Sequence, residues 1–210
     1  MPKPEAVIFD IGNVLIEWQP ERFYDAEVGR ARREEMFAAI DLHDMNEQVD
    51  RGADFRETVL STARAHPEFR TEIEMWYERW IEMAQPMIPH SVHLMQQLQA
   101  RGVPVFSLTN FGVGSYEVAR PHYPFLSAFD RDFISGHMQI TKPAAQIYQM
   151  VEDACGIDPD RLIFTDDRTD NITAAQARGW QTHLFEGPQG WADRLVAEGL
   201  LTKAEAAFGT

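Results

Sequence analysis

Short runs of consecutive apolar residues divide this chain into predicted strands. Runs that are apolar at every position, rather than at alternate positions, are typical of parallel strands covered on both faces. Most of these runs are separated by stretches with helical spacing of apolar residues, such as 91–100 and 171–178, which end near a glycine. This alternation predicts an α/β fold, with a Rossmann-like parallel sheet and helices on both faces. The four runs are Ala6–Phe9, Val103–Leu108, Arg161–Thr165 and Gln181–Phe185.

The segment between the first two predicted strands is too long for a simple connection. A parallel crossover needs about a dozen residues, usually with one helix. The segment 17–89 instead contains three stretches of helical pattern and no convincing strand. We therefore expect residues 18–88 to form an inserted helical cap domain, with residues 1–17 and 89–210 forming an α/β core that carries the catalytic residues.

Composition and charge narrow the functional classes. Hydrophobic residues make up 44% of the 210 residues, which is typical of a globular protein. The formal net charge of −14 argues against a nucleic-acid partner and against an anionic membrane surface. The chain has a single cysteine, no secretion signal in its first residues and no long apolar run, so we expect a cytoplasmic protein. The oligomeric state is left open.

Polar residues follow the predicted strands where an open α/β sheet binds its ligands. We expect several carboxylates, a lysine and a hydroxyl to meet at one sheet edge. Carboxylates that converge repel each other unless a cation lies between them, and oxygen ligands without nearby histidine or cysteine favour Mg²⁺. A dication beside a lysine and a hydroxyl is suited to a phosphoryl group. The residues are Asp10, Thr109, Asn110, Lys142, Asp166 and Asp167.

Each of these residues, taken alone, also has a purely structural interpretation. An aspartate at a strand end, such as Asp10, often forms a turn or caps a helix, and the pair Asp166 and Asp167 fits the same description. Lys142 precedes a proline, which commonly starts a helix. The ordered combination favours the catalytic interpretation over these separate ones.

The ordered set also resembles a known family. The stretches FDIGNVL, LTN, TKP and FTDDRTDN, with a helical insert after the first, resemble the four motifs of the haloacid dehalogenase (HAD) superfamily of hydrolases. The FDIGNV form is most similar to a small-capped phosphatase branch, which includes glucose-1-phosphate phosphatases and the phosphatase domain of soluble epoxide hydrolases. The resemblance implies a Mg²⁺-dependent phosphatase that hydrolyses a small phosphorylated metabolite similar to a sugar phosphate.

Carried over motif by motif, the resemblance assigns roles to individual residues. Asp10 would be the nucleophile that forms an aspartyl-phosphate. Thr109 and Asn110 would donate to the phosphate oxygens, and Lys142 would offset the negative charge. The implied catalytic residues are thus Asp10, Thr109 and Lys142; the implied metal ligands are Asp10, the backbone carbonyl of Gly12, Asp166 and Asp167, with Asp167 the more direct of the last two.

Two residues of the cap region are candidate substrate contacts. Arg51 falls in a loop between expected cap helices, and the cap loop of this family faces the active site. Arg51 would therefore contact the phosphorylated substrate, although a solvated arginine is the simpler interpretation of this residue alone. Trp18, at the hinge, is expected to line the cleft.

Gly12 departs from the family pattern. Most phosphatases of this family carry a second aspartate there, which protonates the leaving alcohol and later activates water. Losing a general acid or base typically costs about 10²–10⁴-fold in rate, unless the leaving group is better or another group substitutes. The sequence leaves three interpretations open: a substrate such as an anomeric sugar phosphate, a slow enzyme, or a non-catalytic phosphate-binding relative.

Two other functions stay as alternatives. A 2-haloacid dehalogenase of the same superfamily needs no metal and usually lacks an acidic fourth motif, so Asp166 and Asp167 argue against it. A signalling receiver or other binding domain can also present aspartate, threonine and lysine at a sheet edge. Receivers, however, are shorter, lack an inserted cap and place an acidic pair early in the chain.

Overall fold

The sheet places the first strand at its centre. The structure is a computed structural model that describes residues 2–209. Its five strands are all parallel and lie in the order β3-β2-β1-β4-β5. In the register of the sheet, Phe9 is aligned with Ser107 on one neighbour and Thr165 on the other. Asp10, which follows Phe9, therefore lies at the carboxyl end of the central strand. The strands are β1 (Ala6–Phe9), β2 (Val105–Thr109), β3 (Arg131–Ile134), β4 (Leu162–Asp166) and β5 (Gln181–Leu184).

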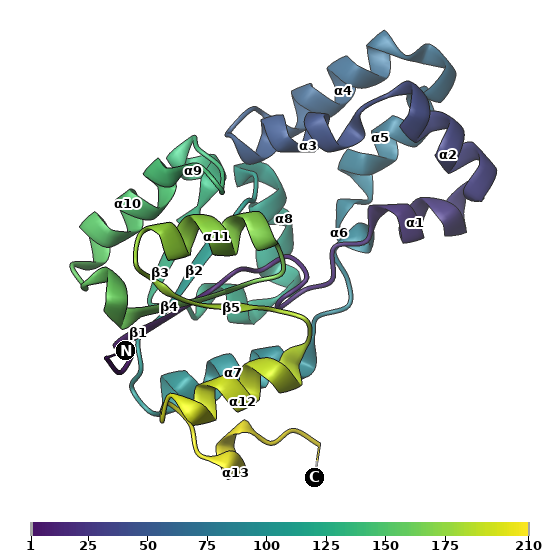
Figure 1. The fold of residues 1–210 in the computed structure, drawn as a ribbon. Coiled ribbons are helices and arrows are strands. Elements are labelled where there is room, and N and C mark those ends of the chain that lie inside the picture. The colour runs from purple at the N-terminus through teal and green to yellow at the C-terminus, as the bar shows by residue number, and fades with distance from the viewer. Residues whose placement is uncertain (1, 210) are drawn as a thin grey trace.

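Helices cover both faces of the sheet, because alternate residues of the buried strands point to opposite sides (Figure 1). Val7 and Phe9 belong to a core cluster that includes residues of α7 (Pro89–Ala100), α8 (Val113–His122) and α12 (Pro188–Ala197). Ala6 and Ile8 belong to the opposite cluster, with α10 (Ala145–Cys155) and α11 (Thr169–Ala177). The predicted α/β fold, with a parallel sheet between helical layers, is confirmed. The core also contains α9 (Ser135–Met138), α13 (Lys203–Ala206) and two 3₁₀ helices, η2 (Pro124–Ser127) and η3 (Pro159–Arg161).

A group of helices follows β1 and lies to one side of the sheet (Figure 1). The first of the three stretches of helical pattern in this segment, residues 20–40, is divided into two helices at Gly29, whose φ of 79° is left-handed and favours glycine. The proposed limits of this cap, residues 18 and 88, stay a prediction. Within residues 2–209, no helix is both long and apolar enough to cross a membrane. The cap helices are α1 (Pro20–Glu27), α2 (Arg30–Ala39), α3 (Leu42–Asp50), α4 (Phe55–Ala65), η1 (Pro67–Phe69), α5 (Arg70–Glu78) and α6 (Trp80–Met83).

Strand β3 and helix α3 are among the elements that escaped the sequence analysis. Strand β3 has the sequence RDFI, and its first two residues are exposed because it lies at the edge of the sheet. It therefore lacks the continuous apolar run of the central strands. Helix α3 has three buried residues, Leu42, Met45 and Val49, on an otherwise polar helix. This weak apolar stripe has the spacing of a helix, and α3 turns out to be important for the site.

The end of helix α3 lies directly against loops of the core. A Cβ atom placed on Gly112 would lie 2.4 Å from Val49 Cγ1, so only glycine permits this approach. The hydroxyl of Ser135 donates a hydrogen bond of 2.6 Å to the carbonyl of Asp50. The same hydroxyl accepts a 2.8 Å hydrogen bond from the backbone N–H of Phe111. Cap and core are thus joined next to the loop that follows β2.

Candidate active site

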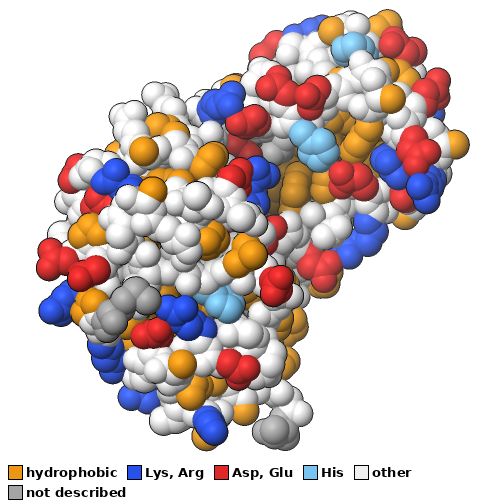
Figure 2. Space-filling view, viewed as in Figure 1, with side chains coloured by type: hydrophobic (Ala, Val, Ile, Leu, Met, Phe, Trp, Pro, Cys, Tyr) orange, Lys and Arg blue, Asp and Glu red, His pale blue; other side chains and the backbone are white. Residues whose placement is uncertain are grey.

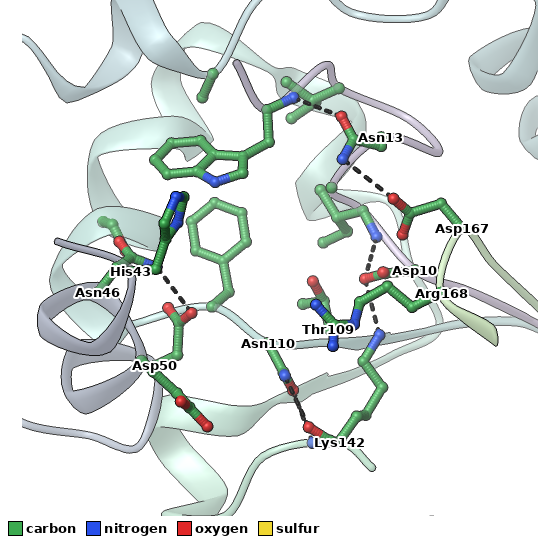
Figure 3. A pocket seen from close by; sticks show the side chains of 18 of the residues that line it. Asp10, Asn13, His43, Asn46, Asp50, Thr109, Asn110, Lys142, Asp167 and Arg168 are labelled. Carbon is green, nitrogen blue, oxygen red and sulfur yellow. Dashed lines mark hydrogen bonds and ion pairs between the residues drawn. The ribbon is translucent and has the colours of Figure 1, made fainter. Parts of the chain in front are cut away.

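A cavity of about 550 Å³ lies between the cap and the carboxyl ends of the strands. Figure 2 shows a hollow between the two lobes, with hydrophobic side chains on its wall and acidic and histidine side chains near its edge. Figure 3 shows His43, Asn46 and Asp50 on one side, and Asp10 and Asp167 on the other. Trp18 lines the cavity, as predicted. The predicted core residues that line it are Asp10, Gly12, Thr109, Asn110, Lys142 and Asp167.

Lys142 links two carboxylates at the inner end of the cavity. Its Nζ lies 3.0 Å from Asp10 Oδ1 and 2.7 Å from Asp166 Oδ2. The side chains of Lys142 and Asp166 are fully buried, and that of Asp10 is 9% exposed. Burial lowers the pKa of Lys142, but attraction to both carboxylates outweighs this and raises its pKa overall. Lys142 therefore remains a cation that compensates the charges of its neighbours.

Negative charge on the Asp10 carboxyl is disfavoured. Its pKa is raised to about 7, chiefly by burial; Lys142 opposes this rise, while Asp166 and Asp167 contribute to it. The backbone N–H of Ile11 donates a 2.7 Å hydrogen bond to Oδ1, which fixes the carboxyl at the end of β1. A further cation at this point would favour the charged form.

Asp167 faces the cavity and is oriented by Asn13. Asn13 Nδ2 donates a 3.1 Å hydrogen bond to Asp167 Oδ2. Asn13 Oδ1 accepts a 3.0 Å hydrogen bond from the backbone N–H of Trp18, so the Asn13 amide has a fixed orientation. Burial raises the pKa of Asp167, an effect that the Asn13 hydrogen bond partly opposes. The turn after β1 thus fixes a carboxylate that follows β4.

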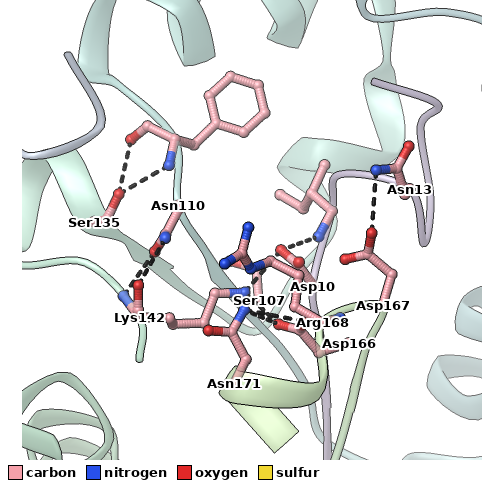
Figure 4. A network of polar contacts seen from close by, with 12 residues as sticks. Asp10, Asn13, Ser107, Asn110, Ser135, Lys142, Asp166, Asp167, Arg168 and Asn171 are labelled. Carbon is pink, nitrogen blue, oxygen red and sulfur yellow. Dashed lines mark hydrogen bonds and ion pairs between the residues drawn. The ribbon is translucent and has the colours of Figure 1, made fainter. Parts of the chain in front are cut away.

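Asp166 is surrounded by donors (Figure 4). Besides Lys142, it accepts a 2.8 Å hydrogen bond from the backbone N–H of Arg168. Asn171 Nδ2 lies 3.0 Å from each of its two oxygens. With these partners, Asp166 serves mainly to hold Lys142, and its oxygens are less available than those of Asp10 and Asp167.

Replacing Asn171 with alanine should therefore destabilise the folded protein, because the buried Asp166 carboxylate loses a hydrogen-bond donor. We expect the variant to lose about 1.5–3 kcal/mol of unfolding free energy, the usual value of a hydrogen bond to a charged group. Urea denaturation measures this loss. Thr173→Ala, a change on the exposed side of the same helix, is the control. An Asn171→Ala variant as stable as this control would contradict the role assigned to Asn171.

Thr109 and Asn110 lie at the end of β2, beside Lys142. Thr109 is buried and lines the cavity. The side chain of Asn110 is bound to the backbone of Lys142: Nδ2 donates to the carbonyl at 3.0 Å, and Oδ1 accepts from the N–H at 2.8 Å. The expectation that the Asn110 amide serves the phosphate is therefore modified, since this side chain joins the loop after β2 to the loop that carries Lys142.

Arg51 is not placed as a substrate contact in the described cavity. It is the residue after α3, its side chain is 50% exposed, and it forms an ion pair with Glu47 on the preceding turn. It is absent from the residues of the described chain that line the cavity. In the structure Arg51 is thus a partly exposed arginine paired on the surface, and residues of α3 line the cavity on this side.

The chemistry of the donor set fits a hard divalent cation. Asp10, Asp166 and Asp167 each offer a carboxylate oxygen, and these oxygens lie within 4.8 Å of one another. Oxygen donors of this kind suit Mg²⁺. Since Asp166 is already engaged by Lys142 and Asn171, the oxygens of Asp10 and Asp167 are the better placed to hold the ion. Gly12 lines the same cavity.

The sequence analysis missed four side chains that shape this site. Asn13, Ser135 and Asn171 orient other residues through hydrogen bonds, and polar residues of this kind give no periodic signal. Asp50 lines the cavity from α3, and it was missed because α3 itself was not predicted. The signal that could have identified α3 is the helical spacing of its apolar residues after Asp41, whose side chain caps the helix by accepting from the backbone N–H of Asp44.

Several known proteins resemble this chain in sequence or in fold. A sesquiterpene phosphatase, AstK of Aspergillus oryzae, is 27% identical over 178 residues, which cover 83% of this chain and 86% of the relative. The HAD family enzyme BT-2542 of Bacteroides thetaiotaomicron has a TM-score of 0.73 at 22% identity, covering 92% of this chain and 99% of that one. The same enzyme in complex with magnesium and inorganic phosphate gives a TM-score of 0.65 at 23% identity, covering 86% and 93% of the two chains.

A dehalogenase also shares the fold. The L-2-haloacid dehalogenase of Xanthobacter autotrophicus, with chloropropionic acid covalently bound, has a TM-score of 0.60 at 17% identity, covering 97% of this chain and 86% of that one. At such identities the structural likenesses show the fold alone. The family's sequence model, that of the haloacid dehalogenase-like hydrolases, in contrast matches residues 4–179, which is most of the chain. The chain therefore belongs to the haloacid dehalogenase-like hydrolase family.

Proposed function

We propose that the protein is a Mg²⁺-dependent phosphatase that hydrolyses a small phosphorylated metabolite through an aspartyl-phosphate on Asp10. The observation that carries this proposal is the buried group of Asp10, Lys142 and Asp166, which opens beside Thr109 into the cavity. A phosphoryl group needs a nucleophile, fixed positive charge and hydrogen-bond donors, and these residues supply all three.

The reaction has two displacements at phosphorus. In the first, an Asp10 carboxylate oxygen attacks the phosphorus, the bond to the substrate oxygen breaks, and its electron pair leaves with the alcohol oxygen. In the second, water attacks the same phosphorus, inorganic phosphate forms, and the Asp10 carboxylate is restored. Lys142 offsets the negative charge of Asp10 and the phosphoryl oxygens throughout, while the Thr109 hydroxyl donates to one of these oxygens.

Asp10 and Asp167, with the Gly12 carbonyl, are the groups that would hold Mg²⁺, and Asp166 would support them from behind. When bound, Mg²⁺ supplies positive charge for the phosphoryl oxygens and favours the charged form of Asp10. This charge is what the acidic cluster lacks: among the described residues, Lys142 is the one cation within ion-pair distance of these three carboxylates, and it contacts only Asp10 and Asp166.

The wall of the cavity supports a substrate with an apolar surface beside its phosphate. Trp18, Trp80 and Phe111 line the cavity, and the ring centroids of the two tryptophans are 5.5 Å apart. Aromatic walls pack against the faces of sugar rings and against hydrocarbon chains. The similarity to a sesquiterpene phosphatase supports the phosphate of a terpenoid hydrocarbon chain, and the FDIGNV form supports a sugar phosphate. We propose that the cap, residues 18–88, selects between them.

Phosphate release tests this function. We expect the purified protein with Mg²⁺ to release phosphate from at least one member of a panel of sugar phosphates and isoprenoid monophosphates. Excess EDTA should lower the rate by at least about 10²-fold, because charge compensation at phosphorus is lost, and added Mg²⁺ should restore it. Activity on no phosphomonoester, or chloride release from 2-chloropropionate without Mg²⁺, would overturn the proposal in favour of a binding protein or a dehalogenase, respectively.

A further inference from the structure

The proposed reaction needs a proton at the oxygen that leaves with the alcohol. An alkoxide is a poor leaving group, so a general acid nearby accelerates its departure. Gly12, which follows the nucleophile by two positions, has no side chain to supply this proton. Asp10 is the nucleophile, and Lys142 is held by two carboxylates. A proton donor must therefore come from another part of the cavity.

Helix α3 presents polar side chains to the cavity. His43, Asn46, Glu47 and Asp50 all line it, and their spacing places them along one face of the helix. The buried residues Leu42, Met45 and Val49 lie on its other side and anchor the helix in the cap. Figure 3 shows Asp50 across the cavity from Asp10, beyond Thr109 and Asn110. This is the side toward which the alcohol portion of a substrate bound at Asp10 would extend.

Asp50 is held in place from both cap and core. Its backbone carbonyl accepts from Ser135, which also bonds to Phe111, a neighbour of Asn110. Asn46 Nδ2 donates a 2.9 Å hydrogen bond to Asp50 Oδ2. Asn46 is itself oriented, because its Oδ1 accepts a 3.2 Å hydrogen bond from Trp76 Nε1. The carboxyl of Asp50 therefore has a defined position on the cap side of the cavity.

We propose that Asp50 is the general acid and base of the reaction, supplied by the cap in place of a side chain at position 12. This inference rests on the proposed phosphatase function. In the first displacement, the Asp50 carboxyl gives its proton to the alcohol oxygen as the bond to phosphorus breaks. In the second, the Asp50 carboxylate takes a proton from the attacking water, which returns Asp50 to its starting form.

The environment of Asp50 suits both roles. The pKa of Asp50 is raised to about 7, chiefly by burial; Glu47 contributes to the rise, while the Gly112 backbone N–H, Asn46 and Lys142 oppose it. A group that titrates near the working pH is present in both its acid and its base form. Of the other titratable side chains on this face, His43 is exposed and lies 3.3 Å from Glu21, and Glu47 forms an ion pair with Arg51, so both are less suited to the role.

The dependence of rate on the leaving group tests the proposal. Asp50→Asn keeps the size of the side chain but removes the exchangeable proton. We expect the rate of Asp10 phosphorylation by an alkyl phosphate substrate to fall by about 10²–10⁴-fold. The burst of nitrophenolate from p-nitrophenyl phosphate, whose leaving group needs no proton, should change less than about threefold. Asp25→Asn, an exposed residue of cap helix α1 that does not line the described cavity, is the matched control and should change neither rate.

A second substitution separates a catalytic from a structural role of Asp50. A Cβ placed on Gly12 meets nothing within 4 Å, and the φ of Gly12 is not left-handed, so an aspartate fits there. The double variant Gly12→Asp/Asp50→Asn should react with the alkyl phosphate at least about tenfold faster than Asp50→Asn alone. Equal losses on both substrates, or a loss that Gly12→Asp does not restore, would overturn the proposal.

The stability of the variant gives a readout independent of turnover. The pKa of Asp50 in the folded state is about 7, above the ordinary value of 3.8 for an aspartate, so the folded state binds the extra proton between these two pH values. Charging Asp50 thus costs stability as pH rises, and this cost is complete above about pH 7. Asp50→Asn removes it, so the variant should melt higher than wild type at pH 8 and not at pH 4. If wild type releases phosphate but Asp50→Asn does not melt higher than wild type at pH 8, Asp50 is not the acid. If wild type releases no phosphate from any substrate, the phosphatase function itself is refuted.

Discussion

Asp10→Asn should abolish turnover, with phosphate release lowered by at least about 10⁴-fold, the scale seen when a covalent nucleophile is removed. The amide keeps the shape of the side chain but cannot form a stable acyl-phosphate. It also removes a charge 3.0 Å from Lys142 Nζ. Phosphate release with saturating Mg²⁺ and the best substrate of the panel measures the effect.

Folding of the Asp10→Asn variant is the necessary control. Lys142 keeps its 2.7 Å contact with Asp166 in this variant, so the buried lysine is not left alone. Burial raises the pKa of Asp10 to about 7, which means that a charged Asp10 costs stability at higher pH. We therefore expect the variant to melt no lower than wild type at pH 8. A folded variant that retained turnover would show that Asp10 is not the nucleophile.

Lys142→Met should impair both folding and activity. The substitution keeps the length of the side chain but leaves the buried carboxylates of Asp10 and Asp166 without their cation. Breaking a buried ion pair by removing one partner typically costs about 3–5 kcal/mol of stability. Turnover should fall by about 10²–10³-fold, since a fixed charge or donor at the reacting group is lost. Urea denaturation and phosphate release measure the two effects.

Lys203→Met is the matched control for this substitution, because Lys203 is exposed on the short helix α13. Its stability and turnover should equal those of wild type. If Lys142→Met were as stable and active as Lys203→Met, the charge compensation assigned to Lys142 would be wrong. A partial recovery of Lys142→Met stability by added Mg²⁺ is expected, because a cation that binds the folded site stabilises the folded state.

The central strands could be predicted because burial on both faces leaves a strong signal. The first run coincides with β1, and the others overlap β2, β4 and β5. The convergence of Asp10, Thr109, Lys142 and Asp167 followed from the rule that parallel strands end at one sheet edge, and these residues do line one cavity. Edge strand β3 has only half of its residues buried, so the same signal was absent.

The cap side of the site could not be predicted, for a physical reason. Its position depends on contacts between residues distant in sequence, such as Ser135 with Asp50 and Gly112 with Val49. Sequence spacing within α3 contains no information about which core loop its end approaches. Arg51 was chosen because it falls in a loop between expected cap helices, yet it pairs with Glu47, and the neighbouring carboxyl of Asp50 lines the cavity instead.

Trapping the covalent intermediate tests the central claim, that Asp10 is phosphorylated during turnover. Wild-type protein is mixed with Mg²⁺ and excess substrate, quenched in acid within one turnover, digested, and analysed by mass spectrometry. The account predicts a peptide containing Asp10 that carries the mass of one phosphoryl group and is absent from Asp10→Asn. The same reaction is then run in ¹⁸O-labelled water. Because water attacks phosphorus in the second displacement, the label should enter the released phosphate. An unmodified Asp10 peptide with label in the Asp10 carboxyl, the result expected when water attacks a carbon ester, would contradict the account.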